Sequence, residues 1–173
     1  AMTARQRANC LGKNIGAVIV VGNRIVSTGY NGVPEGMDNC RHGGCYTCLN
    51  KYQKRGLKIK KNKKDNRKNS KTGKSYDECI CVHAEQNALM SAARFGISIE
   101  GGIIYTTYQP CFTCLKQSLQ AKIKKIYFEK QLYKKDHDRR LIKAYGMLQS
   151  SLPDKMWQVL ASGTIKRHVT PKL

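Results

Sequence analysis

The chain has 173 residues, with 32 Lys and Arg against 11 Asp and Glu, and a formal charge of +21 at pH 7. This length suits one well-buried domain and excludes two of ordinary size, so we expect a single domain over residues 1–173. No apolar run approaches the roughly 20 residues that span a bilayer. The first ten residues also contain no apolar signal-peptide region. These features favour a cytoplasmic or nuclear protein with no membrane partner.

About half of the positive charge lies in one segment. Between Lys51 and Lys74 there are twelve Lys and Arg residues and a single acid. So polar a stretch cannot bury a core, and we expect residues 51–75 to be a flexible insertion in the domain. Such a segment either binds nucleic acid non-specifically through the phosphates or is a solvated loop. Its only aromatic residues, Tyr52 and Tyr76, stand at its edges, which weakens an interpretation based on base stacking.

The hydrophobic pattern, taken in chain order, predicts an α/β domain. Residues 4–11 are expected to end a helix, Gly22-Asn23 to form a hairpin turn, and residues 31–48 to form a loop. The predicted strands are 15–21, 24–28, 103–107, 125–129 and 156–160, and the predicted helices are 83–95, 110–121 and 138–148. A hairpin followed by alternating helices and strands predicts a mixed sheet between helices, in three α/β/α layers.

Two of the predicted helices begin with side chains that bind metals. His83 and Glu85 open one helix, and Cys111 and Cys114 follow a proline at the start of the next. The two cysteines share one helix face, and the free N–H groups at a helix start favour thiolates. A catalytic zinc ion takes three protein ligands and keeps one open position, so His83, Cys111 and Cys114 form a sufficient set. Glu85 is then placed to move protons, whereas a purely structural zinc is the alternative.

The combined pattern H-x-E and P-C-x-x-C resembles the signature of zinc nucleobase deaminases. The stretches NCLGKNIGAVIVVGNRIVSTGYNGVPEG, HAEQNAL and TTYQPCFTCLKQSLQAKIKKIYF together are similar to the deoxycytidylate (dCMP) deaminase family. This resemblance covers most of residues 7–129 and implies a cytidine-deaminase-like fold. It also implies zinc-dependent hydrolysis of dCMP to dUMP and ammonia, with Asn31 contacting the nucleotide. A homo-oligomer with dCTP or dTTP as effectors is a further implication of the resemblance.

Candidate ligands for the nucleotide phosphate are Arg7 and Lys13, which precede the first strand. Six cysteines remain outside the proposed catalytic set: Cys10, Cys40, Cys45, Cys48, Cys79 and Cys81. The resemblance implies that Cys10, Cys40 and Cys81 hold a structural zinc, with Cys45 or Cys48 as a fourth ligand. The thiols left over, together with His42, are candidates for a third ion. The alternative is a group of reduced, buried cysteines without metal, which would be open to oxidation.

Two rival functions remain at this point. The excess of positive charge favours a deaminase that acts on cytosine or adenine in single-stranded DNA or RNA. The cysteine content also suits a catalytically inert binding module that zinc holds together. The presence of Glu85 argues against the inert module, because structural zinc needs no proton carrier.

Overall fold

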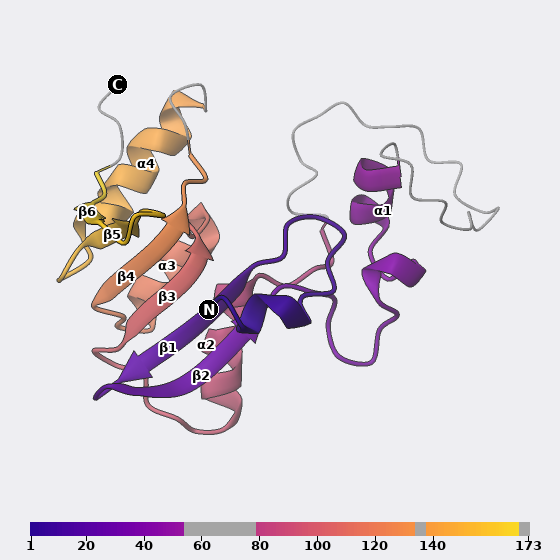
Figure 1. The fold of residues 1–173 in the computed structure, drawn as a ribbon, viewed down its shortest axis with the longest axis horizontal. Helices are drawn as coiled ribbons and strands as arrows, with labels where there is room; N and C mark the ends of the chain where they lie inside the picture. The colour runs from indigo at the N-terminus through magenta and orange to yellow at the C-terminus, as the bar shows by residue number, and fades with distance from the viewer. Residues whose placement is uncertain (54–78, 134–137, 170–173) are drawn as a thin grey trace.

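The computed structural model describes residues 1–53, 79–133 and 138–169. The predicted insertion 51–75 therefore lies, from residue 54 onward, outside the described residues. A six-stranded mixed sheet runs through the domain in the order β2-β1-β3-β4-β5-β6 (Figure 1). Its strands are β1 (Gly16–Val21), β2 (Arg24–Tyr30), β3 (Ile103–Tyr108), β4 (Lys125–Lys130), β5 (Met156–Val159) and β6 (Ile165–Arg167). Strands β3, β4 and β5 are parallel, and the remaining neighbours are antiparallel.

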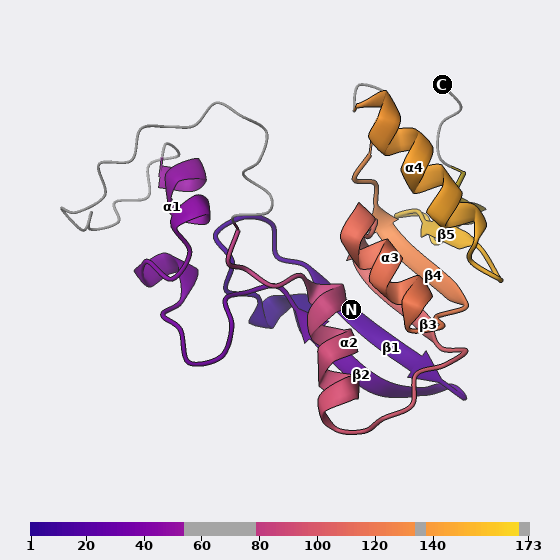
Figure 2. The ribbon, with the colours of Figure 1, turned by 180° about the vertical axis from the view of Figure 1, so that it is seen from behind.

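Three helices cover one face of the sheet: α2 (Ala84–Arg94), α3 (Phe112–Gln120) and α4 (Arg139–Ser150) (Figure 2). Each connects two strands that run in the same direction, and right-handed crossovers that progress along a sheet place their helices on the same side. Their apolar stripes and the sheet residues beneath them form the main core. Its fully buried members include Ala17, Ile19, Ala84, Ile104, Leu115, Ile126, Tyr145 and Met156.

The opposite face is covered near its β1–β2 edge by the 3-10 helix η1 (Ala4–Arg7). A Cβ atom on Gly16 of β1 would lie 2.3 Å from the carbonyl oxygen of Ala1 and 2.4 Å from the amide nitrogen of Arg5. Only a glycine allows so close an approach, so this residue brings the N-terminal turn onto the sheet. The predicted α/β fold with a mixed sheet is confirmed, and its third layer is this short turn.

Two local predictions are wrong, and one strand was not predicted. The expected helix over 4–11 is the 3-10 turn η1 and ends at Arg7; two residues later, the amide of Asn9 donates to the carbonyl of Asn31, which follows β2. Residues 31–48 are not only a loop. They contain the 3-10 helix η2 (Cys40–His42) and the start of α1 (Tyr46–Gln53), which lie beyond the end of β2 (Figure 1). Strand β6, which pairs with β5, was not predicted.

The signals for these elements were weak. Cys45, Cys48 and Leu49 have helical spacing, but the surrounding Gly, Asn and Asp residues are typical of loops. Strand β6 is three residues long and exposed throughout, so no alternation of buried and exposed side chains could mark it. Within the described residues, no helix is both long and apolar enough to cross a membrane.

Candidate functional site

His83, Cys111 and Cys114 converge between the N-terminal ends of α2 and α3. The Nδ1 atom of His83 lies 3.4 Å from the Sγ atom of Cys111 and 3.4 Å from that of Cys114. A tetrahedral zinc ion, with Zn–N near 2.0–2.1 Å and Zn–S near 2.3 Å, separates nitrogen from sulfur by about 3.6 Å. The three donor atoms therefore stand close to the spacing that a single zinc ion requires, and this donor set fits the metal.

The position of His83 depends on how closely α2 packs against β2. A Cβ atom on Gly29 would lie 2.1 Å from the carbonyl oxygen of Ala84, so only glycine permits the observed approach. Side chains also tie the helix to the strand: Ser27 Oγ donates to the carbonyl of Ala88 at 2.7 Å. At the helix start, the His83 amide donates to Gln86 Oε1 at 3.0 Å. These contacts fix His83 as the N-cap residue of α2.

The two cysteines are held by the segments around the start of α3. Gln109 Oε1 accepts from the amides of Leu132 and Tyr133, which joins the end of β3 to the segment after β4. The hydroxyl of Tyr133 accepts a hydrogen bond from the amide of Phe112 at 2.8 Å. Cys111 stands at the N-cap of α3, and its sulfur accepts from the amide of Cys114 at 3.4 Å. Positive charge at this helix end favours thiolate.

Glu85 lies on the first turn of α2 and is buried, with 3% of its surface exposed. The hydroxyl of Thr106 on β3 donates to its Oε1 atom at 2.8 Å and fixes the direction of the carboxyl group. Burial raises the pKa of Glu85 above its ordinary value, since the charged form loses its hydration. A carboxyl with a raised pKa is suited to taking up and returning a proton near neutral pH.

The charges of the three candidate metal ligands depend on one another. The hydrogen bond to Cys111 raises the pKa of His83. The hydrogen bond with Cys111 and burial raise the pKa of the Cys114 thiol. Two buried sulfurs cannot both carry negative charge here without a nearby cation. A divalent metal would meet this need by binding both as thiolates.

The predicted nucleotide ligands differ in exposure: Asn31 is buried, whereas Arg7 and Lys13 are exposed. Asn31 is buried, and its amide group bonds to the backbone: Oδ1 accepts from the amide of Ile15 at 2.7 Å, and Nδ2 donates to the carbonyl of Lys13 at 2.8 Å. It therefore holds the segment before β1, and its role toward a nucleotide stays a prediction. Arg7 is exposed on η1.

The ammonium group of Lys13 lies 4.6 Å from the centre of the Tyr108 ring. Lys130, which sequence reasoning missed, lies 5.8 Å from the same ring. Tyr108 ends β3 and precedes Cys111 by three residues in the chain. Thr106 and Gln86 were also missed. Gln86 had a sequence signal, because a Gln three residues after an N-cap residue is typical of a capping box.

The other six cysteines gather beyond the end of β2, in four segments that belong to different parts of the chain. Their sulfur atoms fall into two sets of four, and within each set all atoms lie within 4.8 Å of one another. The first set is Cys10, Cys40, Cys48 and Cys81, and the second is Cys45, Cys48, Cys79 and Cys81. The structure thus brings all the predicted structural ligands together. His42 is exposed and belongs to neither set.

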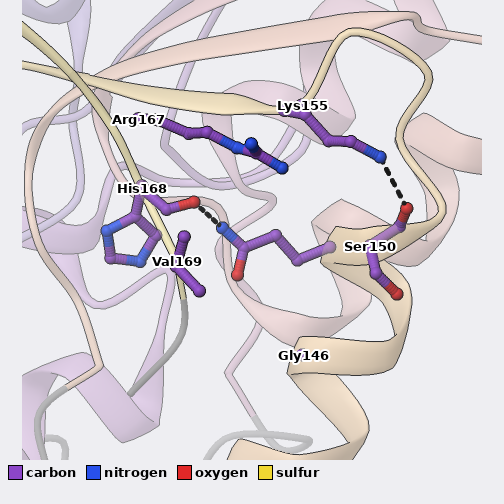
Figure 3. Close-up of a pocket in the computed structure, with 7 residues that line it drawn as sticks. Gly146, Ser150, Lys155, Arg167, His168 and Val169 are labelled. Atoms are coloured by element: carbon purple, nitrogen blue, oxygen red, sulfur yellow. Dashed lines mark hydrogen bonds between the residues drawn. The ribbon is translucent and has the colours of Figure 1, made fainter. Parts of the chain in front are cut away.

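A separate pocket of about 160 Å³ lies between the end of α4 and the β5–β6 hairpin (Figure 3). Lys155 and Arg167 border it, and Lys155 donates to the carbonyl of Ser150 at 3.1 Å. No predicted site residue lines this pocket. This pocket is therefore separate from the candidate site formed by His83, Cys111 and Cys114 at the starts of α2 and α3.

Comparison with known proteins agrees with this geometry. Residues 1–130 match the family described as the cytidine and deoxycytidylate deaminase zinc-binding region. The chain belongs to this family of zinc-binding deaminases.

Among its relatives, the chain is 35% identical over 147 residues to the deoxycytidylate deaminase of Schizosaccharomyces pombe, covering 85% of this chain and 40% of the relative. It is 36% identical over 138 residues to the deoxycytidylate deaminase of Enterobacteria phage T2, covering 71% of this chain and 72% of the relative. The chain thus spans about two fifths of the length of the fission-yeast protein.

Among solved structures, the fold is similar to that of the dCMP deaminase of cyanophage S-TIM5. The TM-score is 0.59 and the sequence identity 26%, with 91% of this chain and 90% of that chain covered. The phage enzyme has also been solved in complex with dCMP and dUMP. The comparisons therefore confirm the predicted cytidine-deaminase-like fold and the zinc-binding family.

Proposed function

We propose that the chain catalyses the hydrolytic deamination of dCMP, in which dCMP and water yield dUMP and ammonia. The observation that carries the proposal is the meeting of His83, Cys111 and Cys114 within tetrahedral spacing, with the buried carboxyl of Glu85 on the same turn as His83. The similarity to deoxycytidylate deaminases over most of the chain supports the choice of substrate.

Each residue then has a distinct role. His83, Cys111 and Cys114 would hold one zinc ion, which supplies a Lewis acid that lowers the pKa of water. The Glu85 carboxylate takes a proton from water and returns it to the leaving ammonia, while Thr106 keeps the carboxyl in one orientation. Because the site is buried, little bulk water competes for these protons.

The substrate's 5′-phosphate needs cations at the mouth of the site. Lys13 is exposed and stands beside Tyr108, and Lys130 approaches the same ring. We assign phosphate binding to Lys13, with Arg7 as a second cation on the neighbouring turn. Asn31 bonds to the backbone of residues 13 and 15 and thereby fixes the position of the Lys13 backbone, from which the ammonium group extends. A homo-oligomer, dCTP or dTTP effectors, and a cytoplasmic or nuclear location belong to the same proposal.

Replacing Glu85 with Gln tests the proton transfer. The amide keeps the shape and the hydrogen bond from Thr106 but cannot accept the proton, so kcat for dCMP should fall by about 10²–10⁴-fold. Zinc content, measured by elemental analysis, should stay at the wild-type value. Near-normal turnover, or loss of the catalytic zinc, would show that Glu85 has another role.

A substrate comparison separates this proposal from polynucleotide deamination. The values of kcat/KM for dCMP, deoxycytidine and a cytosine-containing single strand are measured in one buffer, because salt alters phosphate binding. Charge-assisted hydrogen bonds contribute about 1.5–3 kcal/mol each, so two of them should favour dCMP over deoxycytidine by more than a hundredfold. If the single strand is the best substrate, the chain is a polynucleotide deaminase.

A further inference from the structure

The two sets of four cysteines are not independent, because both contain Cys48 and Cys81. Each of the other four sulfurs belongs to one set only. The sulfurs of Cys48 and Cys81 lie 3.7 Å apart, so this pair forms an edge that the two sets have in common. The six sulfurs are therefore arranged as two four-atom groups joined along one edge.

The spacing of the sulfurs suits zinc in both groups. A tetrahedral ion with Zn–S near 2.3 Å places its sulfur ligands about 3.8 Å apart. The sulfur of Cys48 lies 3.6 Å from that of Cys10 and 3.7 Å from that of Cys79, and Cys45 lies 3.8 Å from Cys79. The pair Cys40 and Cys81 is closer, at 3.0 Å, yet it remains far beyond the roughly 2.05 Å of a disulfide.

We infer that the six cysteines hold a binuclear zinc–thiolate cluster, in which Cys48 and Cys81 bridge the two ions. Two four-coordinate ions need eight metal–sulfur bonds. Four terminal thiolates supply one bond each, and two bridging thiolates supply two each, so six sulfurs meet the need without another ligand. The terminal pairs are Cys10 with Cys40 on one ion, and Cys45 with Cys79 on the other. A single ion in either set would leave two of the six thiols without a metal.

The region around the cluster depends on these sulfurs for its core. Four of the cysteines are buried together, and in the described residues the apolar side chains packed against them, other than cysteine, are Leu11 and Val33. Two side chains of that size cannot stabilise η2, α1 and the approach to α2 by hydrophobic burial. Metal binding would supply the missing free energy of folding, as it does in small zinc domains.

The crowding of the six thiols also favours two bound metal ions. Six thiolates gathered at these spacings repel one another, and four of the cysteines are buried, so little water is present to screen the repulsion. Two divalent ions would relieve this conflict and leave the six thiolates with a net charge of −2.

The cluster also reaches toward the candidate catalytic site. Cys81 lies two residues before His83, and Val82 between them forms a two-way backbone bridge with Gly32, at 3.2 and 2.8 Å. The cluster thus fastens the segment that enters α2 to the loop that leaves β2. The cluster does not depend on the proposed function and would be present whatever substrate the protein accepts.

Metal counting on the whole chain tests the inference. Native mass spectrometry and elemental analysis of protein produced in zinc-supplemented medium should find three zinc ions per chain. Cys45→Ser, which alters a terminal ligand of one ion, should lose one. Cys114→Ser should also lose one, but from the catalytic set, so loss of deaminase activity with an intact cluster is recognisable. Two ions in the wild type, unchanged in Cys45→Ser, would overturn the binuclear cluster, as would iron with acid-labile sulfide.

Cadmium substitution keeps the test valid even if a cysteine variant fails to fold. Wild-type protein refilled with ¹¹³Cd²⁺ should show two thiolate-type cadmium resonances that are scalar-coupled to one another, because coupling passes through a shared sulfur. A third, uncoupled resonance belongs to the His83 set and should vanish in Cys114→Ser. Two uncoupled thiolate resonances, or only one, would refute bridging by Cys48 and Cys81.

Discussion

Replacing Gly29 with alanine tests whether the close packing of α2 on β2 sets the geometry of the candidate site. The added Cβ would lie 2.1 Å from the carbonyl oxygen of Ala84 and 2.5 Å from the amide nitrogen of Ala88. Both are backbone atoms, so no side-chain rotation relieves the overlap. To reach an ordinary contact of 3.4 Å instead of 2.1 Å, the first turn of α2 must move away from the sheet by about 1.3 Å.

Such a shift has two measurable consequences. Overpacking of this kind costs about 1–3 kcal/mol, which should lower the midpoint of thermal unfolding by several degrees. Displacement by about 1 Å separates His83 and Glu85 from their partners on α3 and β3, and a misplacement of that size can reduce activity on the order of 10²-fold. The assays are calorimetry, zinc content and kcat/KM for dCMP.

Two control variants make the result specific. Thr28→Ala changes the adjacent, exposed residue of β2 and should alter the free energy of unfolding by less than about 0.5 kcal/mol. The double variant Gly29→Ala with Ala88→Gly should not recover activity, because the clash is with backbone atoms rather than the Ala88 side chain. If Gly29→Ala has wild-type stability and kcat/KM, the proposed role of this close contact is wrong.

Three further predictions concern single buried or half-buried side chains. Tyr133→Phe removes the acceptor for the Phe112 amide, so chemical denaturation should show a loss of about 1–2 kcal/mol. Asn31→Ala removes both hydrogen bonds to residues 13–15; it should raise KM for dCMP several-fold, and an unchanged KM would separate Asn31 from the substrate. Burial lowers the pKa of His168 below its usual 6.5 or so, so the unfolded chain binds the extra proton first as pH falls. The contribution of neutral His168 to stability is therefore complete above about pH 6.5 and declines as the pH falls below that value. The difference in unfolding free energy between wild type and His168→Gln should shrink on acidification. A difference that stays constant with pH would contradict this prediction.

The candidate metal and proton-transfer residues could be predicted from the sequence because each motif depends on local spacing. His83 and Glu85 lie two residues apart, and Cys111 and Cys114 three apart, each pair at the start of an amphipathic helix. The order of the predicted elements was enough to predict a mixed sheet, since a hairpin followed by alternating helices and strands allows few arrangements. The start of α1 was missed because its helical spacing depends on Cys45 and Cys48, which pack against other cysteines rather than a hydrophobic core.

The sequence by itself determined the kind of chemistry: a histidine, a glutamate and a pair of cysteines in helix-opening motifs, with six further thiols to spare. Tertiary structure decided which atoms meet. Thr106 orients Glu85, Gly29 sets the depth of α2, and Cys48 and Cys81 belong to both thiol sets. No periodicity encodes these relations, because they join segments separated by twenty residues or more, and their distances depend on strand order and on how closely a helix packs on the sheet.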